Sequence, residues 1–90
     1  MNFVWDPKKA SANFKKHGVR FEEACSSLKD FLAITGADPG HSVAEFRWIT
    51  FGVSDNGRLL VVAHTEEADT IRIISARFAT NMERTLYEEG

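Results

Sequence analysis

The dipeptide Asn56-Gly57 constrains the fold of this 90-residue chain more than any other feature. It lies between two stretches rich in β-branched and aromatic residues, 45–53 and 58–65. Asn-Gly adopts the positive φ angles of a type I′ turn, whose twist matches that of two paired strands. The pattern therefore predicts an antiparallel hairpin in which Asn56 and Gly57 alone form the loop. A third strand is expected at 70–77, and a further one is possible at 30–35.

The turn also predicts which side chains share a face of the sheet. Val53 would oppose Leu60, and a four-residue loop at 66–69 would lead into the third strand. One face would carry Ile49, Phe51, Val53, Leu60, Val62, Ile71 and Ile73, with Arg58 and Arg77 at one end and Arg47 and His64 at the other. The opposite face would carry Trp48, Thr50, Gly52, Leu59, Val61, Ala63, Ile74, Ala76 and Arg72. Both faces are apolar, so the second one needs a cover, either a C-terminal helix or another chain.

Two helices are predicted before the sheet and one after it. Asp6-Pro7 is a helix-entry signal, and Gly18 is a stop signal, which together delimit a helix at about 7–17. Apolar residues at positions 21, 24, 25 and 28 indicate a second helix with one buried stripe. Thr80 and Glu83 have the spacing of a capping box that opens a short third helix. The expected fold is α+β, with residues 1–90 forming a single domain.

Composition limits the classes of function. The net charge is −2 and the pI is near 5.9, so any site for a polyanion must be local. No apolar run approaches the roughly 20 residues that span a bilayer, and no signal peptide is visible at the N-terminus. A single cysteine, Cys25, excludes an internal disulfide, which fits a reducing compartment. These features predict a cytoplasmic protein with no membrane segment.

The candidate chemistry rests on basic side chains. The three histidines are far apart in sequence and no Cys pair is present, so neither a metal nor another cofactor is expected. Lys15, Lys16 and His17 close the first helix, where cations either complement the helix dipole or bind a substrate. Each arginine could likewise be a structural partner for one of the thirteen acidic residues. Together, Lys, His and Arg could cleave RNA by attack of the 2′-hydroxyl without a metal.

Several blocks of sequence, in order from end to end, carry a family resemblance. They are Trp5-Asp6 with Lys9 and Asn13, Lys16-His17-Gly18-Val19 with Phe21-Glu22-Glu23-Ala24, residues 57–62 with His64-Thr65, and residues 71–77 with Ala79-Thr80, Glu83-Arg84 and Tyr87-Glu88. The chain resembles the BrnT toxins, the ribonuclease halves of type II toxin–antitoxin pairs. Arg20 departs from the expected pattern, because a capping Ser or Asp would precede the second helix.

The resemblance implies a RelE-like α+β fold, with a small antiparallel sheet, two N-terminal helices and a short C-terminal helix. It also implies a metal-independent endoribonuclease that inhibits translation. The implied partners are RNA and a BrnA-like ribbon-helix-helix antitoxin. The toxin would contact DNA only through this antitoxin. The alternative is an inactive homologue that only binds its antitoxin.

Chemistry and motif position together suggest roles for individual residues. Phosphate contact and acid–base work are assigned to Lys16 and His17, and phosphate binding with transition-state stabilisation to Arg58, Arg72 and Arg77. Further substrate contacts are expected from Arg47, His64 and Lys9. Strict alternation along the strand would place Arg72 and Arg77 on opposite faces, with Arg77 close to Arg58.

Overall fold

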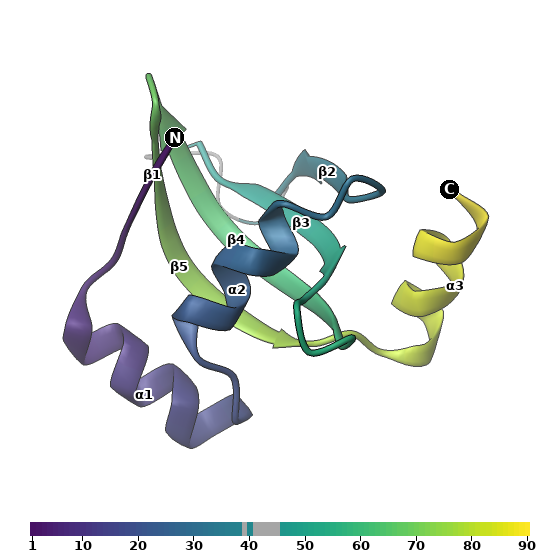
Figure 1. Ribbon diagram of the computed structural model, residues 1–90, viewed down its shortest axis with the longest axis horizontal. Coiled ribbons are helices and arrows are strands. Elements are labelled where there is room, and N and C mark those ends of the chain that lie inside the picture. Colours follow the sequence, from purple (N-terminus) through teal and green to yellow (C-terminus); the bar gives the residue numbers. More distant parts are fainter. Residues whose placement is uncertain (39, 41–45) are drawn as a thin grey trace.

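The computed structural model describes residues 1–38, 40 and 46–90, and it has an α+β fold (Figure 1). Within those residues, one five-stranded sheet has the strand order β1-β5-β4-β3-β2 and is accompanied by three helices. Along the chain the elements are β1 (Asn2–Val4), α1 (Pro7–His17), α2 (Phe21–Leu28), β2 (Ile34–Ala37), β3 (Trp48–Val53), β4 (Leu59–Glu67), β5 (Thr70–Phe78) and α3 (Asn81–Glu89).

Helix α1 begins and ends, and helix α3 begins, where their capping residues predict. The Asp6 side chain accepts a hydrogen bond of 2.8 Å from the Lys8 amide at the start of α1. Gly18 ends this helix in the left-handed conformation, with φ of 72°, and its amide donates to the carbonyl oxygen of Phe14. At α3, both hydrogen bonds of the predicted capping box between Thr80 and Glu83 are present.

The sheet is mixed, because the N-terminal strand β1 pairs in parallel with β5, with Phe3 opposite Ile71. The other three pairings are antiparallel, as expected. A three-residue strand gives too short a pattern to be recognised in the sequence. The possible strand at 30–35 begins only at Ile34 and continues to Ala37.

The β3–β4 hairpin differs by one residue from the predicted register, because Val53 pairs with Leu59 and not with Leu60. Its loop is longer than the two residues of a type I′ turn: the Ser54 amide donates to the Arg58 carbonyl at 2.8 Å, which leaves three residues between them. Within this loop only Gly57 has a positive φ, of 76°. Asn56-Gly57 therefore ends a three-residue loop with glycine in the left-handed position. As a result, Leu60 shares a face with Gly52 instead of Val53.

A β-bulge changes the register between β4 and β5. Ala63 pairs with Ser75 while His64 pairs with Ile73, so Ile74 is an extra residue in β5. The turn between the strands is also shorter than predicted, since Glu67 and Thr70 already pair.

The bulge moves an arginine to the other side of the sheet. Arg72 pairs with Thr65 and Arg77 with Val61. Val61 and Thr65 are four residues apart on one strand and so face the same way. The two arginines therefore lie on the same face of the sheet, and the prediction of opposite faces was wrong.

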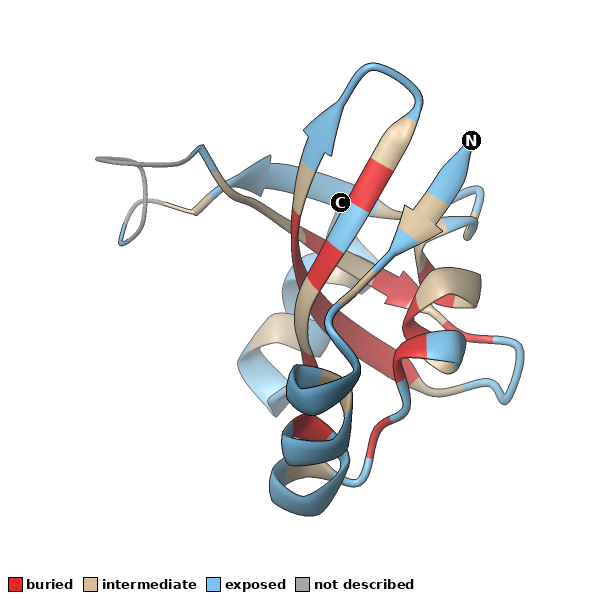
Figure 2. Ribbon diagram, turned by 90° about the vertical axis from the view of Figure 1, so that its left-hand side faces the viewer, coloured by how far each residue is buried: buried red, intermediate tan, exposed pale blue. Residues whose placement is uncertain are grey.

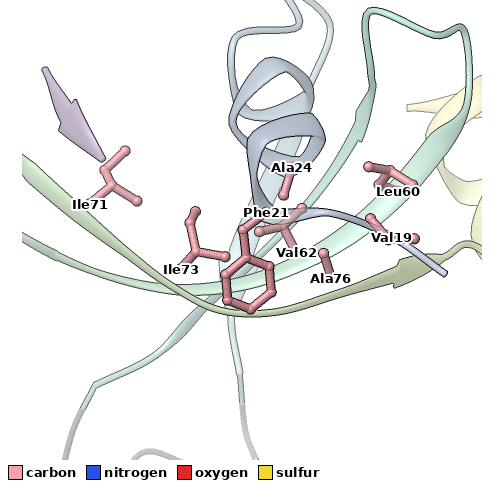
Figure 3. Close-up of a cluster of buried hydrophobic side chains, with 8 residues drawn as sticks. All are labelled: Val19, Phe21, Ala24, Leu60, Val62, Ile71, Ile73 and Ala76. Carbon is pink, nitrogen blue, oxygen red and sulfur yellow. The ribbon is translucent and has the colours of Figure 1, made fainter. Parts of the chain in front are cut away.

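Helices α1 and α2 cover one face of the sheet, called here the helix face (Figure 1). Its core consists of Leu60, Val62, Ile71, Ile73 and Ala76 from the strands, packed against Val19, Phe21 and Ala24 (Figure 3). The close approach of α2 depends on Gly52, because a Cβ atom there would lie 2.1 Å from the Ser27 carbonyl oxygen. The alternate strand residues, which include Ile49, Phe51, Val61, Arg72 and Arg77, form the outer face.

Helix α3 lies apart from α1 and α2, beyond the end of β5 (Figure 1). It covers the outer face only in part, because none of its residues is fully buried and Met82 is 77% exposed. The Tyr87 hydroxyl donates to the Asp30 carboxylate, and the end of the helix touches Ile34. Much of the outer face near β2 and β3 therefore stays open.

Candidate functional site

Basic side chains gather where α1 gives way to α2 and the β3–β4 hairpin approaches. Val19, two residues after His17, belongs to the same buried cluster as Leu60, which follows Arg58 by two residues. Arg20 directly follows Val19 and is the N-cap residue of α2. We call this group the basic corner, and its members are Lys15, Lys16, His17, Arg20 and Arg58. Its members come from three segments whose buried residues Val19 and Leu60 belong to one cluster, in a chain whose net charge is negative.

Asn13 holds the turn that forms the corner. Its side-chain amide donates to the Val19 carbonyl at 3.0 Å and to the Ala76 carbonyl at 2.8 Å, and its Oδ1 atom accepts from the Ala76 amide at 3.0 Å. The residue is buried, so these three bonds satisfy backbone groups that water does not reach. Asn13 thereby fixes α1 to β5 and sets the path of the chain from His17 to Arg20.

Arg58 is both a structural and a surface residue. Its guanidinium forms a bidentate ion pair with Glu23 of α2, and the carboxylate also accepts from the Ser54 hydroxyl at 2.7 Å. The hydrogen bond from Arg58 lowers the pKa of Glu23 more than any other contact. The guanidinium also lies 4.8 Å from the centre of the Phe78 ring, and 40% of the Arg58 side chain is exposed. Arg58 thus joins the hairpin to α2 and still presents a cation at the corner.

Arg20 is a member of the corner that the functional prediction did not include. Its guanidinium lies 4.3 Å from the centre of the Phe14 ring, and Phe14 is 41% exposed. Phe14, Lys15 and Arg20 line a shallow groove of about 290 Å³. Arg20 occupies the N-cap position of α2 without a capping hydrogen bond from its side chain. An arginine where a capping residue is expected was the signal that could have identified it.

Lys9 and Lys16 both lie on α1 and are exposed. They are seven residues apart, which places them on the same side of the helix, about two turns from each other. Lys9 therefore extends the line of positive charge from the basic corner along α1.

Arg77 lies on the outer face and anchors α3. Two hydrogen bonds of 2.8 Å join its guanidinium to the Glu83 carboxylate, and a third of 3.2 Å goes to the Phe78 carbonyl. The bond from Arg77 is the main reason that the pKa of Glu83 falls to about 2. Arg58 pairs with Glu23 on the helix face, so the two arginines lie on opposite faces of the sheet, contrary to the prediction.

Arg72 lies at the other end of the outer face, where β4 and β5 meet at their turn. It lines a broad hollow of about 690 Å³ together with Val4, Phe46 and the acidic residues Glu66 and Glu67. Carboxylates repel phosphate, so this setting is less favourable for RNA than the basic corner.

His64 is buried in the sheet, with 2% of its surface exposed. Its Nε2 atom lies 2.7 Å from the Thr50 hydroxyl, while Nδ1 has no hydrogen-bond partner and lies 3.5 Å from a Glu66 carboxylate oxygen. Burial lowers the pKa of His64, which favours the neutral imidazole. Arg47 is half-buried just before β3, and its carbonyl accepts from the Asp38 amide at 2.9 Å. Neither residue belongs to the basic corner.

In the part of the chain that the structure describes, no three His, Cys, Asp or Glu side chains are grouped to hold a metal ion. Of the three histidines in the sequence, His41 lies outside the described residues. None of the described helices is long and apolar enough to span a bilayer.

The structure is that of a small α+β protein with basic side chains around the turn from α1 to α2. A family model for "Ribonuclease toxin, BrnT, of type II toxin-antitoxin system" matches residues 5–83. The chain therefore belongs to the BrnT family of ribonuclease toxins. The crystal structure of the ribonuclease toxin BrnT from Brucella abortus has a similar fold, with a TM-score of 0.67 and 24% sequence identity over 90% of this chain and 99% of that one. No curated protein matches the chain in sequence.

Proposed function

We propose that this protein is a metal-independent endoribonuclease whose active site is the basic corner. The proposal is supported by lysine, histidine and arginine residues at the end of α1, the start of α2 and the β3–β4 hairpin, in an acidic chain of a ribonuclease-toxin family. These segments are joined by the buried contact of Val19 with the cluster of Leu60 and by the Arg58–Glu23 pair. The protein would act in the cytoplasm, cleave RNA and so inhibit translation. A BrnA-like ribbon-helix-helix antitoxin would neutralise it and provide its only link to DNA.

The corner contains the groups that RNA cleavage requires. His17, half-buried in the last turn of α1, takes the proton from the 2′-hydroxyl as its oxygen attacks the adjacent phosphorus. The bond from phosphorus to the 5′-oxygen then breaks; that oxygen takes up a proton from water, and His17 returns the proton that it accepted to the solvent. Lys16 and the exposed side of Arg58 stabilise the extra negative charge on the phosphate oxygens, and Arg20 and Lys9 bind neighbouring phosphates.

The other four residues that the sequence suggested for the site have other roles in this proposal. Arg77 acts as a positioning residue, because both of its terminal nitrogens bind the Glu83 carboxylate and so fasten α3. Arg72 shares its hollow with Glu66 and Glu67, and Arg47 and His64 lie away from the corner. We assign direct contact with the reacting phosphate to none of these four residues.

One observation favours the alternative, an inactive homologue that only binds its antitoxin. Glu23 already forms a bidentate pair with Arg58, and this carboxylate offsets much of the positive charge that a phosphate would meet. The two hypotheses differ in a single property, which is whether the isolated protein cleaves RNA.

The test is cleavage of a labelled single-stranded RNA by the purified protein, with and without EDTA. Cleavage that persists in EDTA supports the proposal. His17→Ala should lower the single-turnover rate by about 10²- to 10⁴-fold, the usual contribution of acid–base catalysis. Lys8→Ala is the matched control for Lys16→Ala, because it removes the same charge from the first turn of the same helix, and it should change the rate less than about twofold.

Two results would contradict the proposal. RNA left intact by wild-type protein that still binds its antitoxin would favour the inactive homologue. Wild-type rates in the Lys16→Ala and His17→Ala double variant would place the active site elsewhere.

A further inference from the structure

An exposed apolar surface runs along the edge of the sheet at β2. All four residues of β2 are exposed, and the strand forms one edge of the sheet (Figure 2). Just before it, Phe31 is 98% exposed and Leu32 is 68% exposed. Single exposed apolar residues are common, whereas a continuous patch of them marks a binding surface.

Two grooves make this surface continuous. The first, of about 310 Å³, crosses the outer face and is lined by residues 34–37 of β2 with Ile49 and Phe51 of β3. The second, of about 420 Å³, lies between residues 31–34 and the end of α3. Ile34 lines both grooves and connects them. We call the two grooves together the apolar strip.

The residues that line the apolar strip favour a protein over RNA as its binding partner. Among the described residues, neither groove is lined by a lysine or an arginine, and the one charged residue in their lining is Glu88, at the end of α3. Glu89 follows it and is also exposed. An RNA backbone would find no cation here and would be repelled by the carboxylates. The surface instead suits an apolar segment with positive charge at one end.

We propose that the apolar strip is where the antitoxin binds, through an amphipathic segment with apolar side chains in both grooves and a Lys or Arg facing Glu88. This inference rests on the proposed function, in which a cognate antitoxin exists, and it adds the surface and the chemistry of the contact. Helix-in-groove binding of this kind uses apolar anchors at intervals of three or four residues.

The strip and the basic corner lie on different faces of the sheet. Ile34 and Phe51 are paired on the outer face, whereas Arg58 and the ends of α1 and α2 belong to the helix face. Substitutions in the strip therefore separate antitoxin binding from RNA cleavage.

Gly36 provides a sharp test. It lies in the middle of β2, lines the first groove, and has no atom within 4 Å of the place where a Cβ would stand. A tryptophan at this position would fit the free protein but would fill the groove. Gly36→Trp should weaken binding of the antitoxin by about 100-fold, the loss typical of a blocked hot spot. Leu32→Lys, which removes an apolar contact from the second groove and places a cation beside Glu88, should also weaken binding of the antitoxin.

The probe is the protein encoded by the reading frame next to this gene, with binding measured by calorimetry. Ala12→Trp adds the same side chain at an exposed position of α1 and is the control, with expected wild-type affinity. RNA cleavage by free Gly36→Trp should equal that of the wild type. If wild-type protein leaves RNA intact while Gly36→Trp still loses the antitoxin, the proposed function fails and the assignment of the surface stands.

Three outcomes would overturn the inference. Wild-type antitoxin affinity in both Gly36→Trp and Leu32→Lys would place the contact elsewhere. Failure of the neighbouring protein to bind the wild type would remove the proposed occupant. A wild-type homodimer in sedimentation that becomes monomeric in Gly36→Trp would show that a second copy of this chain occupies the strip.

Discussion

Replacement of Asn13 by alanine should destabilise the protein by about 3 kcal/mol. The side chain makes three hydrogen bonds to backbone groups of Val19 and Ala76. A buried hydrogen bond contributes roughly 1 kcal/mol net, and a buried group left without a partner costs 1–3 kcal/mol. The expected loss is a large part of the roughly 5–13 kcal/mol that stabilises a domain of 90 residues.

The assay is thermal unfolding followed by circular dichroism. A loss of about 3 kcal/mol should lower Tm by roughly 12–24 °C in a domain of this size. Ser11→Ala, at an exposed position of the same helix, is the control and should change Tm by only a few degrees. Because the Asn13 amide orders the turn between His17 and Arg20, RNA cleavage by Asn13→Ala should fall even at temperatures where the variant remains folded.

Asn13→Asp gives a stricter test, because it keeps the shape of the side chain and replaces the donor NH2 group by an acceptor oxygen, while the bond from the Ala76 amide to Oδ1 is kept. At neutral pH its carboxylate would face the carbonyl oxygens of Val19 and Ala76, both acceptors, at about the distances of the present bonds. Asn13→Asp should therefore be less stable than Asn13→Ala at neutral pH, and part of the loss should return in acid, where the carboxyl group can donate. An Asn13→Asp protein as stable as wild type would refute the reasoning.

Two other positions give contrasting predictions. Gly52→Ala places a methyl group against the Ser27 carbonyl and should cost about 1–3 kcal/mol, whereas Gly36→Ala, in open space, should be nearly neutral in the same urea titration. Burial lowers the pKa of His64 below its unfolded value of 6.5, so the unfolded chain binds the proton more tightly and stability should fall as the pH drops below about 6.5. His64→Gln should remove this loss, which has a slope of at most about 1.4 kcal/mol per pH unit; an unchanged slope between pH 5 and 7 would contradict it.

The features predicted correctly from sequence are those encoded by neighbouring residues. Asp6, Gly18 and the capping box at Thr80 act within a turn of helix, so the ends of the helices could be predicted. The strand register could not. Asn56-Gly57 is compatible with both a two-residue and a three-residue loop, and the second places glycine alone in the left-handed conformation.

The candidate site was predicted in part for the same reason. Lys16 and His17 were identifiable because a helix end gathers its cations locally. Arg77 was assigned to the face of Arg58 because alternation was assumed to be uninterrupted, and the bulge at Ile74 has no local sequence signal. Arg20 required knowledge that Phe14, six residues earlier, would lie beneath its guanidinium.

The extra residue in β5 reverses which positions of the strand face the helices. Before Ile74, odd-numbered positions face the helices, and after it even-numbered positions do, as Ile73 and Ala76 show. A deletion of this one residue would rotate the rest of the strand by half a turn. Arg77 would then point into the core, Ala76 would turn away from Asn13, and α3 would lose its anchor. The spacing of five between Arg72 and Arg77 is therefore as much a requirement of the fold as the identity of either residue.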